Sequence, residues 1–166
     1  MKNLVSIKFC FFSISGYCQS AREYVDSGIE KEDLGDYRGA ILEYNNAVNV
    51  DQNYRWAHYN RANAKAHLHD YRGAIADCNK AIELYPDYEK AFETRGDTKD
   101  DLKDYTGAIR DYTKVIEINP SKAMAYLKRG LTRIKIKQKE SGCLDLRKAG
   151  ELGHKEAYDA IRDLCN

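Results

Sequence analysis

From residue 21 onward, small and apolar residues recur at spacings of three and four, the spacing that gives an α-helix one apolar stripe. Between residues 55 and 84 such residues stand at Ala57, Ala62 and Leu68, and then at Ala74, Ile75, Cys78, Ala81 and Ile82. Asp70 stands between the two stripes, where it can cap the second helix, and Pro86 follows, where a proline ends a helix. The pattern predicts two helices joined by a short turn.

The same pattern returns every 34 residues, since Asp-Tyr-Arg-Gly-Ala-Ile at 36–41 recurs at 70–75 and, with Thr for Arg, at 104–109. A degenerate fourth copy keeps the register. One column of the repeat holds small residues at Gly28, Ala62, Gly96 and Gly130, and another holds acids at Glu43, Asp77, Asp111 and Asp145. A single helical hairpin cannot bury its own apolar stripe, so we expect the hairpins to stack.

The second helix of each unit carries a recurring signature: Ala40-x3-Tyr44-x2-Ala47, Ala74-x3-Cys78-x2-Ala81 and Ala108-x3-Tyr112-x2-Val115, with Pro86 and Pro120 closing two units. This signature resembles the tetratricopeptide repeat (TPR) family. The resemblance implies an all-α, right-handed superhelix of four helix-turn-helix repeats at 21–54, 55–88, 89–122 and, degenerate, 123–154. A C-terminal capping helix is expected at 155–166. The end of the chain is similar to small exported bacterial TPR proteins.

The first eighteen residues contain Lys2 and Lys8, no acidic residue and a short apolar stretch. This layout is typical of a secretory signal peptide. We therefore expect one at 1–20, cleaved after Cys18 or Ser20, and an exported protein that is periplasmic or secreted. The stretch is too short to span a bilayer, which needs about 20 residues. The alternative is an additional helix at 4–14 on a cytoplasmic protein.

Removal of the leader leaves three cysteines, Cys78, Cys143 and Cys165. Cys78 takes the place of Tyr44 and Tyr112, which predicts a buried free thiol. At 1.5 Å per residue, Cys143 and Cys165 each lie about 14–15 Å from the turn between their helices. Antiparallel packing would bring them level, so we expect a disulfide between them. Two packed thiols are the alternative.

The sequence offers little that predicts chemistry. Lys+Arg number 27 and Asp+Glu 26, for a net charge of +1, whereas a nucleic-acid-binding protein is usually far more basic. Gly-rich phosphate loops, Cys-x-x-Cys and His-Glu-x-x-His are missing, and His58 falls in a packing column. We interpret the acidic column as solvated surface. We expect no enzyme, metal site, cofactor, nucleic-acid partner or membrane span.

The remaining candidate is a surface. The TPR resemblance implies a concave groove, lined by the first helix of each unit, in which the family binds peptides or partner proteins. The groove residues that we select are Trp56, Tyr59, Asn60, Asn63, Lys90, Glu93, Asp97, Asp101 and Lys128. Their aromatic, amide and acidic groups favour an extended or helical segment with basic character. The sequence thus predicts a non-catalytic binding scaffold, although Trp56 could equally pack on the preceding helix.

Three alternatives bear on this interpretation. TPR members that bind chaperone tails use a five-residue carboxylate clamp, of which Asn60 and Lys90 match two positions, so we do not expect such tails as ligands. A basic run could form an anion-binding patch, although a solvated helix face is favoured; it comprises Lys128, Arg129, Arg133, Lys135, Lys137 and Lys139. A structural subunit that self-associates through the ends of the array is the second possible function.

Overall fold

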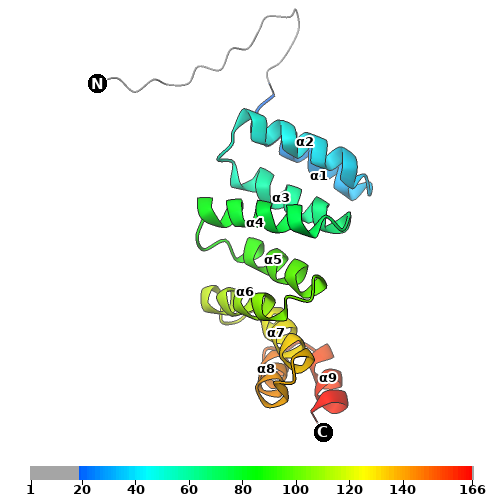
Figure 1. The fold of residues 1–166 in the computed structure, drawn as a ribbon, viewed down its shortest axis with the longest axis vertical. Helices are drawn as coiled ribbons and strands as arrows, with labels where there is room; N and C mark the ends of the chain where they lie inside the picture. The colour runs from blue at the N-terminus through cyan, green and yellow to red at the C-terminus, as the bar shows by residue number, and fades with distance from the viewer. Residues whose placement is uncertain (1–18, 166) are drawn as a thin grey trace, which may run out of the picture.

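The computed structural model describes residues 19–165, and these form nine α-helices with no strand among them (Figure 1). In chain order they are α1 (Ala21–Asp33), α2 (Tyr37–Val50), α3 (Arg55–His67), α4 (Tyr71–Leu84), α5 (Glu89–Asp101), α6 (Tyr105–Ile118), α7 (Ala123–Lys135), α8 (Lys139–Glu151) and α9 (Glu156–Leu164). The predicted signal peptide lies outside the described residues, apart from its last two positions.

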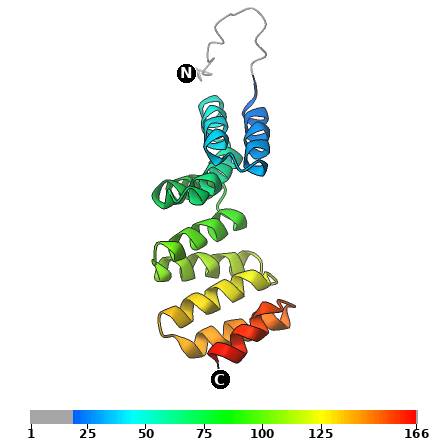
Figure 2. The ribbon, with the colours of Figure 1, turned by 90° about the vertical axis from the view of Figure 1, so that its right-hand side faces the viewer.

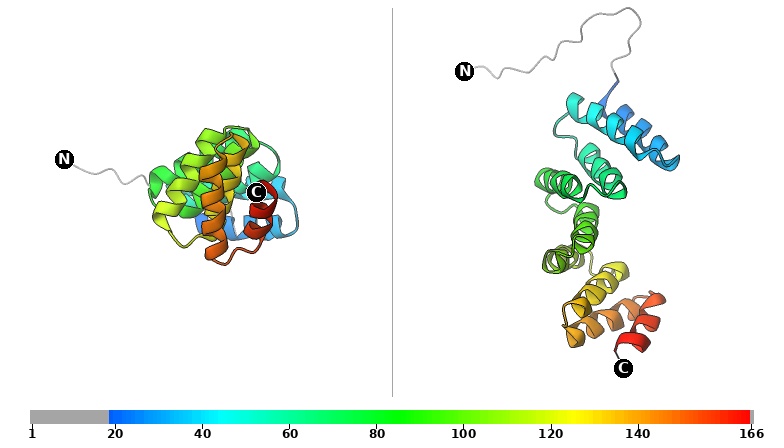
Figure 3. Two further views of the ribbon diagram at one scale, coloured as in Figure 1. Left: turned by 90° about the horizontal axis from the view of Figure 1, so that it is seen from below. Right: turned by 45° about the vertical axis from the view of Figure 1, so that its right-hand side comes forward.

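The helices stack along the long axis of the molecule, so that α1 and α9 lie at opposite ends (Figures 1 and 2). Each helix up to α8 packs on the next one in the chain, and α3 also contacts both α1 and α5. Viewed along the stack, successive pairs are turned relative to one another (Figure 3). The predicted all-α superhelix of helical hairpins is confirmed.

The repeated Asp-Tyr-x-Gly-Ala segment is a helix cap. The side chains of Asp36, Asp70 and Asp104 accept hydrogen bonds from the backbone N–H of the glycine three residues later, at 2.9–3.0 Å. A Cβ on Gly73 would stand 2.1 Å from Oδ2 of Asp70. Glycine is therefore needed for the carboxylate to approach the helix end, and the predicted cap at Asp70 is confirmed.

The acidic column is not solvated surface, contrary to our expectation from the sequence. Asp77, Asp111 and Asp145 are only 5%, 2% and 5% exposed. Each accepts two hydrogen bonds from an arginine on the preceding helix: Arg61 to Asp77, Arg95 to Asp111 and Arg129 to Asp145. A buried carboxylate requires such pairing to offset the loss of water.

The same arginines also tie adjacent repeats together. Arg61 donates to Oδ1 of Asn45 on α2, in the unit before its own, at 2.8 Å. Arg95 bonds Asn79, and Arg129 bonds Thr113, in the same way. In the first unit Ser27 takes the arginine position, and the half-buried Glu43 pairs with Lys31 at 3.0 Å instead. The acidic column therefore fixes how one hairpin sits on the next.

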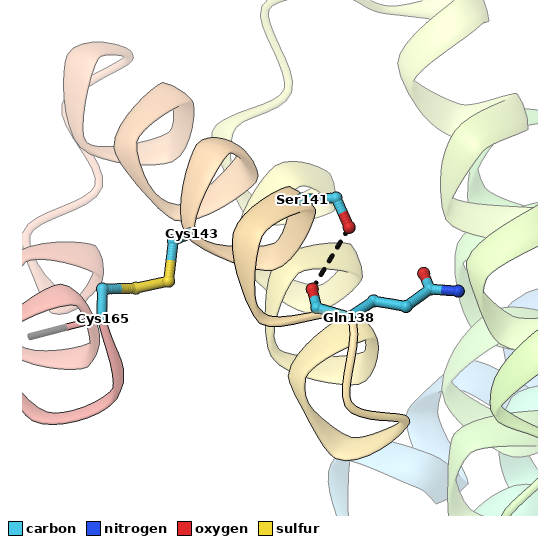
Figure 4. Close-up of a disulfide and its surroundings, with 4 residues drawn as sticks. All are labelled: Gln138, Ser141, Cys143 and Cys165. Atoms are coloured by element: carbon cyan, nitrogen blue, oxygen red, sulfur yellow. Dashed lines mark hydrogen bonds between the residues drawn. A yellow bond between two sulfur atoms is a disulfide. The ribbon is translucent and has the colours of Figure 1, made fainter.

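At the C-terminal end, α9 covers the apolar side of α7 and α8. Ala157 is fully buried, in a cluster with Leu127 and Leu146. A disulfide joins Cys143 on α8 to Cys165 at the end of α9, with a Cα–Cα distance of 5.8 Å (Figure 4). Cys78 is buried and, within residues 19–165, is the free cysteine. Both predictions for the described cysteines are confirmed.

Candidate functional site

Two hollows lie along the first helices of the second, third and fourth units. The larger, of about 340 Å³, is lined by Asn63, Ala66, His67, His69, Tyr71, Thr94, Asp97, Thr98 and Asp101. The smaller, of about 240 Å³, is lined by Asp97, Asp100, Asp101, Tyr112, Lys128, Leu131, Thr132 and Lys135. Asp97 and Asp101 border both hollows, which therefore form one surface that runs over α3, α5 and α7.

Four of the nine residues selected from the sequence line these hollows: Asn63, Asp97, Asp101 and Lys128. Asn63 on α3 is bridged to the next unit, because the Thr94 hydroxyl donates to its Oδ1 at 2.9 Å. Asn60 is half-buried, Lys90 is exposed, and neither lines the two hollows.

The selected aromatic residues pack against the residue that leads into α5. The rings of Trp56 and Tyr59 lie 5.5 Å and 5.1 Å from the ring of Tyr88, the residue that precedes α5. The guanidinium of Arg55 lies over the Trp56 ring at 5.2 Å. Burial raises the pKa of the Tyr88 hydroxyl. Trp56 and Tyr59 are thus half-buried where α3 packs against the start of α5.

Two of the three selected acids, Glu93 and Asp97, pair with lysines of this same chain. Lys128 Nζ donates to Glu93 at 3.0 Å and to Asp97 at 2.8 Å. Burial by itself would raise the pKa of Glu93, but the ammonium of Lys128 outweighs it and lowers the pKa below its usual value. Three of the selected residues therefore lie together, and their charges satisfy one another.

Asp101 differs from its neighbours. It is exposed at the end of α5, and its side chain makes no hydrogen bond or ion pair with the described part of the chain. By contrast, Lys122 neutralises Glu89, and Lys135 neutralises Asp100. Asp101 is thus the carboxylate on this surface that is left for a ligand or for water.

The basic run is largely engaged inside the protein. Arg129 and Arg133 both bind Asp145, and Lys128 and Lys135 bind acids of α5. An anion would have to displace these partners. Lys128, Arg129 and Arg133 therefore belong to a structural network. At these three positions the run is neither the solvated helix face that the sequence favoured nor a free anion-binding patch.

Some residues of the larger hollow were not selected from the sequence. Tyr71 belongs to a column with Tyr37 and Tyr105 at the start of each second helix, and His69 hydrogen-bonds its hydroxyl at 2.8 Å. This recurring tyrosine is the sequence signal that could have identified Tyr71 as a surface residue of interest. His58, expected to be packed and hydrogen-bonded, is 5% exposed, and its Nε2 lies 2.9 Å from the Gln52 carbonyl oxygen.

Within residues 19–165, no group of three or more His, Cys, Asp or Glu side chains is arranged to hold a metal ion. None of the helices in this range is long and apolar enough to cross a membrane.

Comparison with protein families gives matches over most of the helical array. Tetratricopeptide repeat profiles match residues 56–88 and 89–122, and a TPR repeat profile matches residues 33–68. The chain belongs to the tetratricopeptide repeat family. A search of curated proteins found no match.

Solved TPR structures share the fold. A crystal structure of MamA superposes with a TM-score of 0.78 at 25% identity, covering 83% of this chain and 81% of that one. The first TPR of Spaghetti (RPAP3), bound to the HSP90 peptide SRMEEVD, gives 0.69 at 28% identity over 70% and 92% of the two chains. The second TPR domain of human RPAP3, in complex with an HSP70 peptide, gives 0.66 at 28% identity over 68% and 94%.

Proposed function

We propose that this TPR protein is a non-catalytic scaffold that binds a segment of another protein along α3, α5 and α7. The observation that carries the proposal is the surface made by the two hollows, to which three successive units contribute. The RPAP3 domains, which are similar in fold, bind peptides in their solved complexes. A repeat fold supplies a shape, and the surface residues select the ligand.

The charge of the surface favours a basic segment. Asp101 is unpaired, and Asp97 borders both hollows beside it. The HSP90 peptide in the RPAP3 complex, SRMEEVD, ends in acidic residues, and like charges brought together weaken binding. We therefore propose that chaperone tails are not the ligand of this chain, and a direct titration with SRMEEVD tests this.

Photo-crosslinking can locate the bound segment. A photoreactive residue at Leu131, which lines the smaller hollow on α7, is expected to capture the partner, whereas the same residue at Arg110, exposed on α6, is not. The captured segment is then identified by mass spectrometry. Equal capture at both positions would contradict binding along the first helices.

The identified segment allows a quantitative test. Tyr59→Ala and Asn63→Ala are each expected to weaken its binding by about 1–3 kcal/mol, and Arg110→Ala to leave it unchanged. The alternative function, self-association through the ends of the array, predicts a molecular mass that rises with protein concentration in light scattering. A monomer at all concentrations argues against it.

We further propose that the protein is exported. The Cys143–Cys165 disulfide supports this, because disulfides form and persist in oxidising compartments. Ser20 caps α1, accepting from the Glu23 backbone N–H at 3.2 Å while Glu23 accepts from the Ser20 N–H at 2.7 Å. Cleavage after Cys18 retains this capping box, and cleavage after Ser20 destroys it. We expect native protein to begin at Gln19 by N-terminal sequencing. Recovery of a chain beginning at Met1 would contradict export.

A further inference from the structure

Neighbouring repeats meet through one contact that recurs along the chain. The tyrosine that opens a second helix faces the last residue of the first helix in the next unit. Tyr37 stacks on His67, with ring centroids 4.4 Å apart and planes at 15°. In the corresponding contact farther along, the ammonium of Lys135 lies 5.4 Å from the ring of Tyr105. In both places, a planar ring or a cation covers the tyrosine face.

The middle contact, which lies between the Tyr37–His67 and Tyr105–Lys135 contacts along the chain, is different. A shift of 34 residues from Tyr37 and His67 leads to Tyr71 and Asp101. The face of an aromatic ring is negative and attracts cations, so a carboxylate cannot cover Tyr71 as Lys135 covers Tyr105. Both Tyr71 and Asp101 line the hollow of about 340 Å³. The equivalent hollow at the next contact is smaller, at about 240 Å³, and it is lined by Lys135 but not by Tyr105. At the middle contact the tyrosine ring itself borders the hollow.

The walls of this hollow are held in place. The His69 ring positions the Tyr71 hydroxyl at 2.8 Å. Asp97 is fixed by two donors, the Tyr112 hydroxyl at 2.8 Å and Lys128 Nζ at 2.8 Å. The five carboxylates along this stretch of α5 face three lysines, and Asp101 remains without a partner. The carboxylates are Glu89, Glu93, Asp97, Asp100 and Asp101, and the lysines are Lys122, Lys128 and Lys135.

We propose that this hollow binds the guanidinium of an arginine side chain from the partner. The proposal rests on the proposed function and names the group that the surface recognises. The planar guanidinium stacks on Tyr71, as the His67 ring stacks on Tyr37, and its N–H groups donate to the Asp101 carboxylate. Arginine combines stacking and paired donors in one side chain, which the ammonium of lysine does not.

The test uses a single-residue probe, N-acetyl-arginine amide, titrated into the protein lacking residues 1–18. The ring resonances of His67 and His69, which line the hollow, are followed by NMR. We expect these two to shift saturably in the millimolar range, while the buried His58 does not move. Asp101→Asn should weaken the probe by about tenfold, the loss of one hydrogen bond to a charged group.

Asp33→Asn is the matched control. Asp33 is the last residue of α1, as Asp101 is of α5, but the first unit has no preceding repeat in the described part of the chain and so no equivalent hollow. This variant should bind the probe like the unmodified protein. Asp101→Lys, which places a cation opposite Tyr71 as Lys135 stands opposite Tyr105, should abolish binding while circular dichroism stays the same.

Two further probes test the chemistry. N-acetyl-citrulline amide has the shape of the arginine probe without its charge and should produce no saturable shift. N-acetyl-lysine amide should bind several-fold more weakly, and equal binding would overturn the assignment to a planar cation. The absence of saturable shifts with the arginine probe, or equal shifts in Asp101→Asn, would overturn the site. Neither result affects crosslinking at Leu131 or the Tyr59 and Asn63 variants, so failure of the arginine site and failure of the proposed function can be told apart.

Discussion

Gly96 on α5 lies directly against the ring of Tyr112 on α6, so that a Cβ at Gly96 would stand 2.8 Å from Cε1 of the tyrosine. The ring cannot move aside, because Tyr112 is only 2% exposed and its hydroxyl donates to Asp97. In the second unit the same two positions hold Ala62 and Cys78, both fully buried. A larger residue on one helix is thus matched by a smaller residue on the other.

This match predicts the effect of a single methyl group. Gly96→Ala should lower the free energy of unfolding by about 1–3 kcal/mol through overpacking, even though alanine is the better helix former. Adding Tyr112→Cys, which recreates the Ala62–Cys78 pair, should cost less than the two single changes summed. Urea denaturation measures all three variants. Strict additivity would show that the two residues do not compete for space.

The stability effects of changing Arg95 and Asp111 should also be non-additive. Arg95→Met leaves Asp111, whose side chain is 3% exposed, with Lys99 alone. It should cost about 3 kcal/mol, the penalty of removing one partner from a buried ion pair. The double variant Arg95→Met, Asp111→Leu should cost less than the sum of its parts. Arg110→Met, an exposed arginine on α6, is the control and should change stability by less than about 0.5 kcal/mol. Equal losses at Arg95 and Arg110 would contradict the role of the buried pair.

Acid should weaken the protein through Asp77. Burial alone would raise the pKa of this carboxyl, but the His58 ring, 3.6 Å away, and hydrogen bonds from Arg61 and Lys65 outweigh it and hold the pKa below its usual value. A folded-state pKa below the unfolded one stabilises the fold above about pH 4, and this stability is lost as the pH falls further. We expect the urea midpoint to hold between neutral pH and that value and to fall below it. Asp77→Asn should be less stable at neutral pH and should lose less stability in acid, and an unchanged acid slope would contradict the assignment.

Thiol counting tests the cysteine arrangement. Denatured, unreduced protein lacking residues 1–18 should contain one reactive thiol, that of Cys78. In the folded protein this thiol should react slowly, because burial raises the pKa of Cys78 to about 12. Cys165→Ser opens a loop with a sequence separation of 22 and should cost about 3 kcal/mol, with hydrogen exchange increasing first in α9. Three thiols in the denatured protein would refute the disulfide.

The helical hairpins, the cap at Asp70, the buried thiol of Cys78 and the Cys143–Cys165 disulfide could all be predicted from the sequence. Each depends on a regular spacing: three and four residues for an apolar stripe, 34 for the repeat, and 1.5 Å per residue for the level of two cysteines on adjacent helices. Local geometry and simple stacking determine these features. They can therefore be predicted from the spacing of residues along the chain.

The burial of Asp77, Asp111 and Asp145 was decided only by the tertiary structure. Each carboxylate meets an arginine sixteen residues earlier in the chain, as Arg61 meets Asp77, and that arginine also reaches back to the preceding hairpin. An acidic residue on a helix looks the same in sequence whether water or a guanidinium faces it. The outcome depends on how two helices cross, which no periodicity along one helix contains.

For the binding surface too, part could be predicted from the sequence and part only from the structure. The sequence placed Asn63, Asp97, Asp101 and Lys128 on the first helices of their units, and these residues do line the hollows. Only the structure showed that Lys128 already neutralises Glu93 and Asp97, and that Trp56 and Tyr59 pack on Tyr88. Which charge remains free depends on how far side chains from different repeats can reach one another. The distances between stacked hairpins determine which charges pair. They leave Asp101 unpaired in the hollow that Tyr71 also lines.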